Sequence, residues 1–233
     1  MSKNTEIKLN IGCGYLNTPK NWVNIDNSLS ARLAKYPLIK EFLYKMKILP
    51  KRLHDLPWPS SITVLDVRKG LPYKDGTVKY IYTSHLLEHL SRNAVKHFLN
   101  ECYRVLRKGG IVRIIVPDLQ IRIRSYIQKM EDIGERKSNN TSISPADEFL
   151  EGLGLFSNEK NNSFLIKSIK FLQGNKNIHK WMYDYYSLEF KLKQCGFNNI
   201  TQRGYLDSQI EDIGLLDNPD RFRYCLCVEA NKG

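Results

Sequence analysis

The chain has 233 residues, 42% of them hydrophobic, which is enough for one sizeable core and favours one domain or at most two. Lys and Arg outnumber Asp and Glu by 36 to 24, but they are spread along the sequence, so we expect a solvated basic surface rather than a dedicated nucleic-acid site. No segment approaches the roughly 18 apolar residues of a membrane span, and five scattered cysteines argue against a disulfide framework, so we expect a soluble, cytoplasmic protein.

Two short apolar runs, residues 7–11 and 22–25, are predicted strands. The first ends in Gly12-Cys13-Gly14 and the second in Asp26. The residues between them are too few for a full helix, and Pro19 lies among them. We therefore predict an unusually short crossover.

Residues 28–52 have an apolar stripe at helical spacing between lysines, interrupted by Pro37 and Pro50. We expect these helices to cover a sheet edge, with a membrane surface as the alternative. Residues 62–65 are the third predicted strand, which ends in Asp66.

Residues 78–82 predict a fourth strand, and residues 86–106 predict a long amphipathic helix that Gly109 and Gly110 terminate. The apolar run 111–116 is typical of a central parallel strand. This alternation of strands and helices predicts a doubly wound α/β sheet.

The last third begins with a predicted helix at 119–132 and a polar insertion at 133–163. A helix at 164–172 follows, then one that Ser187 caps and Gly196 ends. Strands at 199–206 and 223–230 are expected to pair antiparallel. We predict a single domain over 1–233, with insertions at about 28–60 and 133–178 that form a cap or lid.

Chemically useful residues follow the predicted strands one after another, and the carboxyl ends of strands are where open α/β sheets bind ligands. A glycine turn lets a ligand approach the backbone, and an acid after the second strand suits a ribose diol. The residues concerned are Gly12, Gly14, Asp26, Asp66, Ser84, His85 and Asp118.

Four blocks carry a family resemblance: LNIGCG (9–14), DVRKGLPYKDGTVKYIYTSHLLEHL (66–90), ECYRVLRKGGIVRIIVPD (101–118) and HKWMYDYYSLEFKLKQCGF (179–197). Together they resemble class I S-adenosylmethionine-dependent methyltransferases of the type-11 kind. The resemblance covers most of the chain. It implies a Rossmann-like fold, mostly parallel with seven strands and an antiparallel last strand, and S-adenosylmethionine as cofactor.

The resemblance also implies roles for individual residues. Gly12, Cys13 and Gly14 would face the methionine part of the cofactor, while Asp26 would bind the ribose hydroxyls. Asp66 and the Val67 backbone would address adenine, and Ser84 would lie near the sulfonium. At Asn10 the sequence departs from the family, because an acid is usual there. Caps and turns are the structural alternative for Asp26, Asp66 and Asp118.

His85, Glu88 and His89 spell H-x-x-E-H, a zinc-protease pattern. Here the pattern begins at the end of a strand, and no third ligand is evident, so we expect no metal. We predict instead that His85 is the general base for a hydroxyl acceptor, oriented by Glu88 at i+3.

The segment 179–186 combines histidine, lysine and aromatic residues, a composition that suits sugars, bases or phosphates. We name His179 and Tyr183, together with His89, as acceptor-side candidates. A packed lid against the core is the structural alternative, and for His89 it is a buried histidine bonded to backbone.

The resemblance thus implies a methyltransferase acting on a small-molecule or glycan-type acceptor: a sugar, a nucleotide sugar or a phosphoryl group, with a role in surface polysaccharide biosynthesis. Two alternatives stay open. The net charge of +12 allows RNA as acceptor, and the substitution at Asn10 allows a cofactor-binding scaffold without catalysis.

Overall fold

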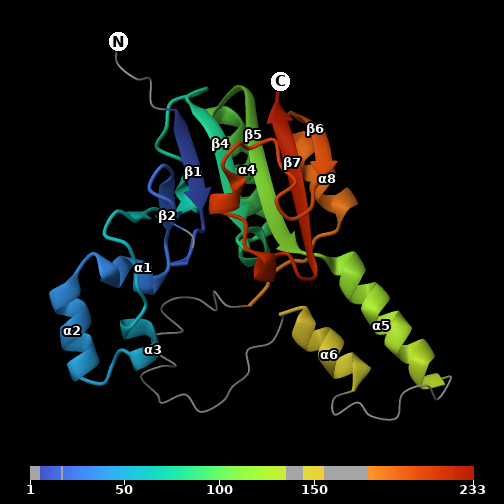
Figure 1. Cartoon of the computed structure of the whole chain (residues 1–233), viewed down its shortest axis with the longest axis horizontal. Coiled ribbons are helices and arrows are strands. Elements are labelled where there is room, and N and C mark those ends of the chain that lie inside the picture. Colours follow the sequence, from blue (N-terminus) through green and yellow to red (C-terminus); the bar gives the residue numbers. More distant parts are fainter. Residues whose placement is uncertain (1–5, 17, 135–143, 155–177) are drawn as a thin grey trace.

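The computed structural model describes residues 6–16, 18–134, 144–154 and 178–233. Its seven strands form one sheet in the order β3-β2-β1-β4-β5-β7-β6 (Figure 1). The neighbours from β3 to β5 pair parallel, and β7 pairs antiparallel with both β5 and β6. The predicted Rossmann-like, mostly parallel sheet with an antiparallel last strand is confirmed. The strands are β1 (Ile7–Ile11), β2 (Val23–Asp26), β3 (Thr63–Val64), β4 (Val78–Ser84), β5 (Leu106–Pro117), β6 (Phe197–Gln202) and β7 (Cys225–Lys232).

The described helices lie between and beyond these strands. They are α1 (Leu29–Ala34), α2 (Pro37–Lys45), α3 (Lys51–His54), α4 (Arg92–Val105), α5 (Leu119–Gly134), α6 (Pro145–Gly152) and α8 (Tyr185–Gln194). Short 3-10 turns occur at η1 (Val67–Lys69), η2 (Leu87–His89), η3 (Ile213–Leu215) and η4 (Pro219–Arg221). The described residues between β1 and β2 contain no helix, as the short crossover predicts.

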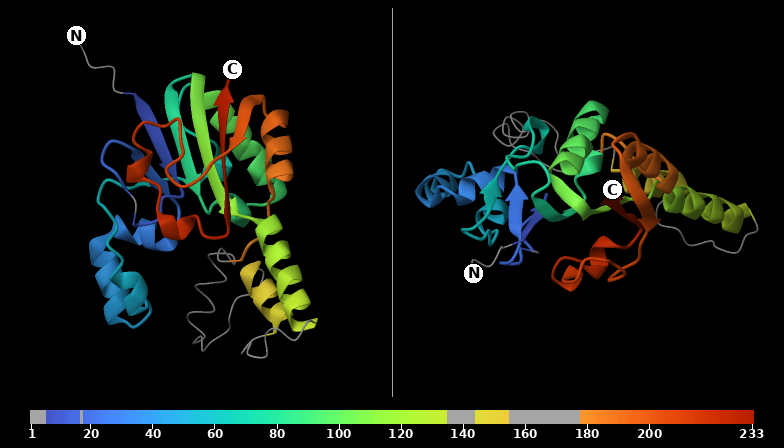
Figure 2. Two further views of the ribbon diagram at one scale, coloured as in Figure 1. Left: turned by 45° about the vertical axis from the view of Figure 1, so that its right-hand side comes forward. Right: turned by 90° about the horizontal axis from the view of Figure 1, so that it is seen from above.

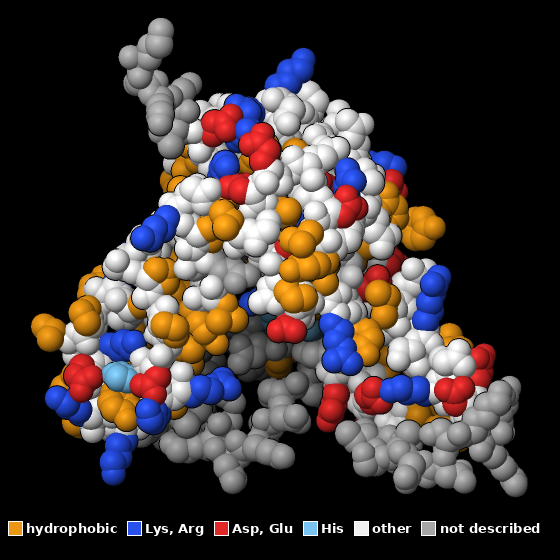
Figure 3. Space-filling model, in the orientation of Figure 1, with side chains coloured by type: hydrophobic (Ala, Val, Ile, Leu, Met, Phe, Trp, Pro, Cys, Tyr) orange, Lys and Arg blue, Asp and Glu red, His pale blue; other side chains and the backbone are white. Residues whose placement is uncertain are grey.

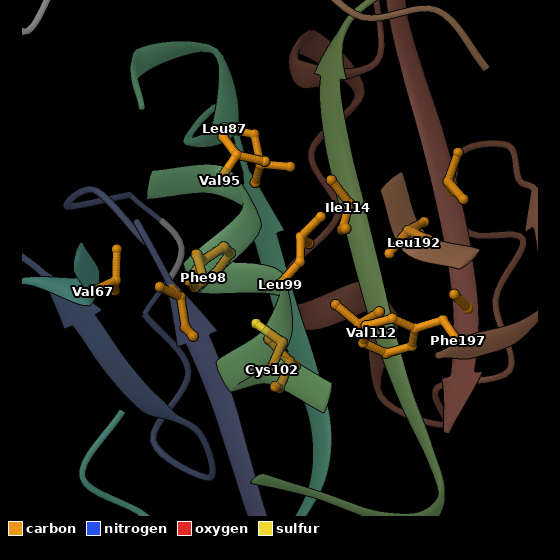
Figure 4. Packing of buried hydrophobic residues seen from close by; sticks show 14 of the residues in the cluster. Val67, Leu87, Val95, Phe98, Leu99, Cys102, Val112, Ile114, Leu192 and Phe197 are labelled. Atoms are coloured by element: carbon orange, nitrogen blue, oxygen red, sulfur yellow. The ribbon is translucent and has the colours of Figure 1, made fainter. Parts of the chain in front are cut away.

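Alternate residues of β5 face two different layers. Val112, Ile114 and Val116 belong to the larger core cluster, together with buried side chains of α4 and α8 such as Phe98 and Leu192 (Figure 4). In the view from above, α4 and α8 lie on this face of the sheet and the segment with η3 and η4 lies on the other (Figure 2). The main hydrophobic core is therefore on the α4 side.

The opposite face is covered by a C-terminal segment of turns, residues 204–224, rather than by long helices. Ile111 and Ile115 of β5 pack there with Ile213 and Leu216. Arg113 shares their face of the strand and is fully buried. This segment places C-terminal residues of the sequence beside the carboxyl ends of β1 and β4.

The helix predicted at 86–106 begins later and ends earlier than the periodicity suggests. Ser91 caps α4, because its side chain accepts the amide of Ala94 at 3.3 Å. Gly109 and Gly110 lie within β5 instead of ending the helix. A Cβ at Gly110 would lie 2.8 Å from the carbonyl oxygen of Arg107, so a close backbone approach explains that glycine.

Two further boundaries differ from prediction. Asp184, not Ser187, is the N-cap of α8, and the two form a reciprocal capping box in which Ser187 is the N3 residue. The last strands are β6 and β7, shifted by two residues from the predicted 199–206 and 223–230 at most ends and by four at the end of β6. Their antiparallel pairing is confirmed.

The expectation that residues 28–52 cover a sheet edge is wrong. Pro37 and Pro50 do divide the segment into α1, α2 and α3, but no residue of α2 is buried. Leu38 and Phe42 are exposed. The helices pack on one another, with the rings of Tyr44 and His54 stacked 4.1 Å apart. With only two residues, β3 offers these helices little edge to cover.

Figure 1 shows α1–α3 and α5–α6 extending beyond the carboxyl ends of the parallel strands. Tyr126 of α5 contacts Phe149 of α6, with ring centroids 5.2 Å apart. The predicted helix at 164–172 and most of the 133–178 insertion lie outside the described residues, so the division into one domain with a cap stays a prediction. Among the described helices, none has the length and apolar character needed to cross a bilayer.

Candidate active site

A pocket of about 330 Å³ opens at the carboxyl ends of β1 and β4. Both the glycine turn after β1 and the C-terminal segment contribute to its walls. The lining residues are Asn10, Gly12, Cys13, Leu16, Tyr82, Ser84, Leu216, Asn218 and Arg221. Sequence reasoning had selected four of them: Asn10, Gly12, Cys13 and Ser84.

The glycine turn is held against β2 by backbone hydrogen bonds. The amides of Gly12 and Cys13 donate to the carbonyl oxygen of Ile25 at 2.8 and 3.2 Å. Gly12 and Gly14 have φ values of +71° and +61°, which disfavour residues with a Cβ. A Cβ on Gly12 would also lie 3.3 Å from Leu86. Gly12 and Cys13 of the turn line the pocket, and the missing side chain of Gly12 leaves room there.

Asp26 links the glycine turn to the next helix. Its carboxylate accepts the amide of Gly14 at 3.1 Å and the amide of Ser28 at 2.7 Å. The side chain is partly buried at the end of β2 and does not line the pocket itself. The turn role that we gave as the structural alternative is therefore present, and ribose binding by Asp26 stays a prediction.

Asp66 and Val67 lie further along the same edge of the sheet and outside the pocket. Asp66 accepts the amide of Arg68 as the N-cap of η1 and forms two bonds to its guanidinium, at 2.8 and 2.6 Å. Val67 is buried in the main core. The cap that we gave as the structural alternative for Asp66 is thus present.

Asn10 and Ser84 lie at the bottom of the pocket, on adjacent strands. Asn10 is buried, and its amide donates to the side-chain oxygen of Asn24 at 2.9 Å. Ser84 is also buried, and among the described residues its hydroxyl has no hydrogen-bond partner. A buried hydroxyl without a partner is costly, so this group suits a bound polar ligand.

His85 follows β4 directly and has a strained backbone, with φ of +54°. Its Nδ1 lies 3.2 Å from the Glu88 carboxylate, so the predicted i to i+3 contact is present. Its Nε2 lies 3.3 Å from the carbonyl oxygen of Arg221 and 3.6 Å from the Cys225 sulfur. Burial of the ring opposes protonation, but the contacts with Cys225 and Glu88 outweigh it and raise the pKa of His85 to about 9.

The acceptor-side candidates separate into a pair and a core residue. The rings of His89 and His179 meet edge to face, with centroids 5.1 Å apart. Burial lowers the pKa of His89. Tyr183, by contrast, is 1% exposed and packs in the main core, so it is not placed to touch an acceptor. Its backbone carbonyl instead accepts the amide of Leu119.

Asp118 is the helix cap that the sequence suggested. Its carboxylate accepts the amide of Gln120 at 2.8 Å and that of Ile121 at 3.3 Å. It is buried and is not among the pocket residues.

The C-terminal wall of the pocket was not predicted from sequence. Leu216, Asn218 and Arg221 come from a segment that is more than 120 residues away from Ser84 along the chain. The local signal in this segment is Asn218-Pro219, where the side chain of Asn218 caps η4. This signal identifies a turn and says nothing about where the turn packs.

Comparison with known proteins gives one family match. The family model described as a methyltransferase domain matches residues 9–114, which run from β1 to the middle of β5. A comparison with curated protein sequences gave no match.

Several solved structures are similar at low identity. A methyltransferase from Methanosarcina mazei is 15% identical and has a TM-score of 0.48, with 97% of this chain and 92% of that chain covered. One from Aquifex aeolicus is 15% identical, with a TM-score of 0.44 and coverage of 98% and 83%. One from Archaeoglobus fulgidus is 14% identical, with a TM-score of 0.43 and coverage of 97% and 86%. All three are described as S-adenosylmethionine-dependent methyltransferases.

The family match covers a little less than half of the chain, from β1 into β5. The strand order is that of a Rossmann-like methyltransferase fold. Two features of the pocket suit a bound polar ligand. Gly12 leaves room beside the turn, and the Ser84 hydroxyl has no partner among the described residues.

Proposed function

We propose that this chain is an S-adenosylmethionine-dependent methyltransferase, in line with the family match over residues 9–114. Its acceptor would be a small molecule or glycan, namely a sugar, a nucleotide sugar or a phosphoryl-containing compound in surface polysaccharide biosynthesis. The observation that carries the proposal is the pocket at the mouth of β1 and β4, bounded by Ser84 and by the C-terminal segment. Its place at the carboxyl ends of parallel strands is where open α/β sheets bind ligands. The cytoplasm is the proposed location, which agrees with five free cysteines.

The proposed cofactor residues lie on consecutive strand ends. Gly12, Cys13 and Gly14 would face the methionine part, with Asn10 beneath them. Asp26 would bind the ribose hydroxyls on the far side of the turn. When bound, the cofactor supplies an electrophilic methyl group on a sulfonium. The protein's task is then to align the acceptor with that methyl group and to exclude water.

Asp66 and Ser84 would hold the two ends of the nucleoside region. Asp66 already has Arg68 as an ion-pair partner. The proposed contact with adenine would therefore be shared between Asp66 and the backbone of Val67, the first residue of η1. The Ser84 hydroxyl would donate to a polar atom near the sulfur, and this bond would satisfy a group that has no partner among the described residues.

His85 is the proposed residue beside the transferable methyl group, and the general-base role stays a prediction. In this structure both ring nitrogens have partners, Glu88 on one side and Arg221 on the other. Proton transfer from an acceptor hydroxyl would require the contact with Arg221 to open. As it stands, His85 positions η4 against the end of β4, which shapes the acceptor side of the pocket.

RNA is the second candidate acceptor, because the formal charge is +12. On the face shown in Figure 3, Lys and Arg are interspersed with Asp and Glu and do not form one continuous basic stripe. This arrangement favours the small acceptor over the polynucleotide.

The test combines binding with methyl transfer. Calorimetric titration with S-adenosylmethionine and S-adenosylhomocysteine checks the cofactor site. Radiolabelled methyl transfer is then measured to nucleotide sugars, to oligosaccharides and to total RNA. We expect label in the sugar-containing acceptors. Label in RNA, with binding that weakens steeply as salt rises, would favour the second candidate. Tight cofactor binding with no labelled product from any acceptor would favour a scaffold.

A further inference from the structure

Three side chains that are candidate metal ligands converge beside the acceptor side of the pocket. Glu88 and His89 belong to η2, and His179 comes from the segment that precedes α8. The Glu88 carboxylate and one ring nitrogen of each histidine lie within 4.8 Å of one another. We name these residues the E88/H89/H179 cluster. Two separate segments therefore supply one compact set of donor atoms.

The hydrogen bonds of the two imidazoles leave one nitrogen of each ring available. Nδ1 of His179 lies 2.7 Å from the carbonyl oxygen of Leu153, and Nδ1 of His89 lies 3.4 Å from that of Ile178. A carbonyl only accepts, so each Nδ1 carries the proton and each Nε2 keeps a lone pair. Imidazole ligands of metals commonly have this backbone bond on the far nitrogen.

Glu88 has one cationic partner, His85, which leaves much of the acceptor capacity of its carboxylate unused. Its side chain is fully buried, and neither carboxylate oxygen has a hydrogen bond among the described residues. Its one ionic contact there is with Nδ1 of His85, at 3.2 Å. Burying a carboxylate with so few partners is costly. A metal ion would satisfy the remaining lone pairs.

The backbone holds the cluster in place. The carbonyl oxygen of Glu88 accepts the amide of Lys180 at 2.7 Å, which ties η2 to the segment that carries His179. Gly154, with φ of +65°, accepts the amide of His179 at 2.9 Å. A Cβ on Gly154 would lie 2.5 Å from Nδ1 of His179, so only glycine allows the ring to occupy this place.

We propose that Glu88, His89 and His179 bind a divalent transition-metal ion, with Zn²⁺ the best match to two imidazoles and one carboxylate. Three protein ligands leave a fourth position for water or a substrate oxygen, which is the composition of catalytic rather than structural zinc sites. Because Glu88 also contacts His85, the fourth position adjoins the side of the pocket where we place the acceptor. The inference does not depend on the proposed acceptor, since metal binding is measured without methyl transfer.

The proposal revises the expectation from sequence. The H-x-x-E-H pattern suggested His85 and His89 as a ligand pair and offered no third ligand. Residues 87–89 form a 3-10 turn instead of an α-helix, and the cluster combines His89 with His179. His85 lies outside it, with its Nε2 directed to the carbonyl of Arg221.

The test is metal binding by the full chain. Chelator-treated protein is titrated with ZnCl₂ in a calorimeter, and CoCl₂ is added in parallel to record visible absorption. We expect one equivalent of Zn²⁺ and a tetrahedral Co²⁺ spectrum. His179→Ala and Glu88→Gln should each weaken binding by about 100-fold, since each removes a ligand. His97→Ala is the matched control, because His97 is an exposed histidine outside the cluster, and it should bind as the wild type does.

A rescue variant separates ligation from packing. His179→Cys should restore much of the affinity that His179→Ala loses, and should add thiolate absorption to the Co²⁺ spectrum. Circular dichroism verifies that the variants are folded. No saturable binding by wild type, or equal affinity in wild type and His179→Ala, would overturn the proposal and leave Glu88 as the partner of His85 alone.

Discussion

The guanidinium of Arg113 lies 2.7 Å from the carboxylate of Asp217, and neither side chain is exposed to solvent. Arg113 also pairs with the buried Glu229 at 2.9 Å and donates to the carbonyl oxygens of Gly204 and Asp207. These bonds attach the C-terminal segment to the central strand β5. Since this segment contributes Leu216 and Arg221 to the pocket, the ion pair also positions one wall of the site.

The first prediction concerns this network. Arg113→Met should destabilise the protein by about 3–5 kcal/mol, because it leaves the buried Asp217 without its cation and the buried Glu229 with only Arg203, at 3.5 Å. Urea unfolding measures the change. Arg107→Met is the control: Arg107 pairs with Glu6 on the surface, so its loss should cost about 1 kcal/mol or less. Equal costs in the two variants would contradict the assigned role.

The second prediction tests the diol site. Asp26→Asn keeps the size of the side chain and removes its charge, so it should weaken binding of S-adenosylhomocysteine about 10- to 100-fold, the equivalent of one charged hydrogen bond. Calorimetric titration gives the affinity, with Asp75→Asn, an exposed carboxylate far from the pocket, as control. Unchanged affinity would place the ribose elsewhere.

The third prediction separates backbone strain from site geometry. Gly12→Ala and Gly109→Ala both force alanine to a φ of +71°, at a cost of about 1–2 kcal/mol each. Gly12 borders the pocket and its added Cβ meets Leu86, whereas a Cβ at Gly109 meets nothing within 4 Å. Only Gly12→Ala should therefore lose cofactor affinity in a titration, although both should unfold at lower urea. Equal affinities would show that the turn does not contact the cofactor.

The fourth prediction is a pH dependence. Hydrogen bonds from Arg104, together with one from the amide of Leu71, lower the pKa of Glu101 to about 2, against burial that acts the other way. A lowered folded-state pKa means that the stabilisation is complete above the unfolded value near 4.5 and is lost as the pH falls toward 2. Glu101→Gln should therefore be less stable than wild type at pH 7, by about 1–3 kcal/mol.

The check is urea unfolding at several pH values. The difference between wild type and Glu101→Gln should stay constant from pH 7 to about 5 and narrow below pH 4.5. A difference that does not change with pH would show that Glu101 contributes through shape rather than charge.

Much of the architecture follows from local pattern. The apolar run of β5, the short crossover after Gly14 and the proline breaks at residues 37 and 50 are set by steric and hydrophobic rules that act over a few residues. Helix ends were less well predicted. Competing caps decide them, as Ser91 and Asp184 show, and periodicity alone does not distinguish a 3-10 turn from the first turn of a helix.

By itself, the sequence determined the class of fold, the strand ends beside the glycine turn, and the residues Asn10, Gly12, Cys13 and Ser84 that line the pocket. Only the tertiary structure decided which distant segments meet there. Arg221 lies in the pocket, and His179 lies beside Glu88, because folding packs segments that are far apart in sequence against one another. Such contacts depend on the packing of whole elements, which no local pattern encodes.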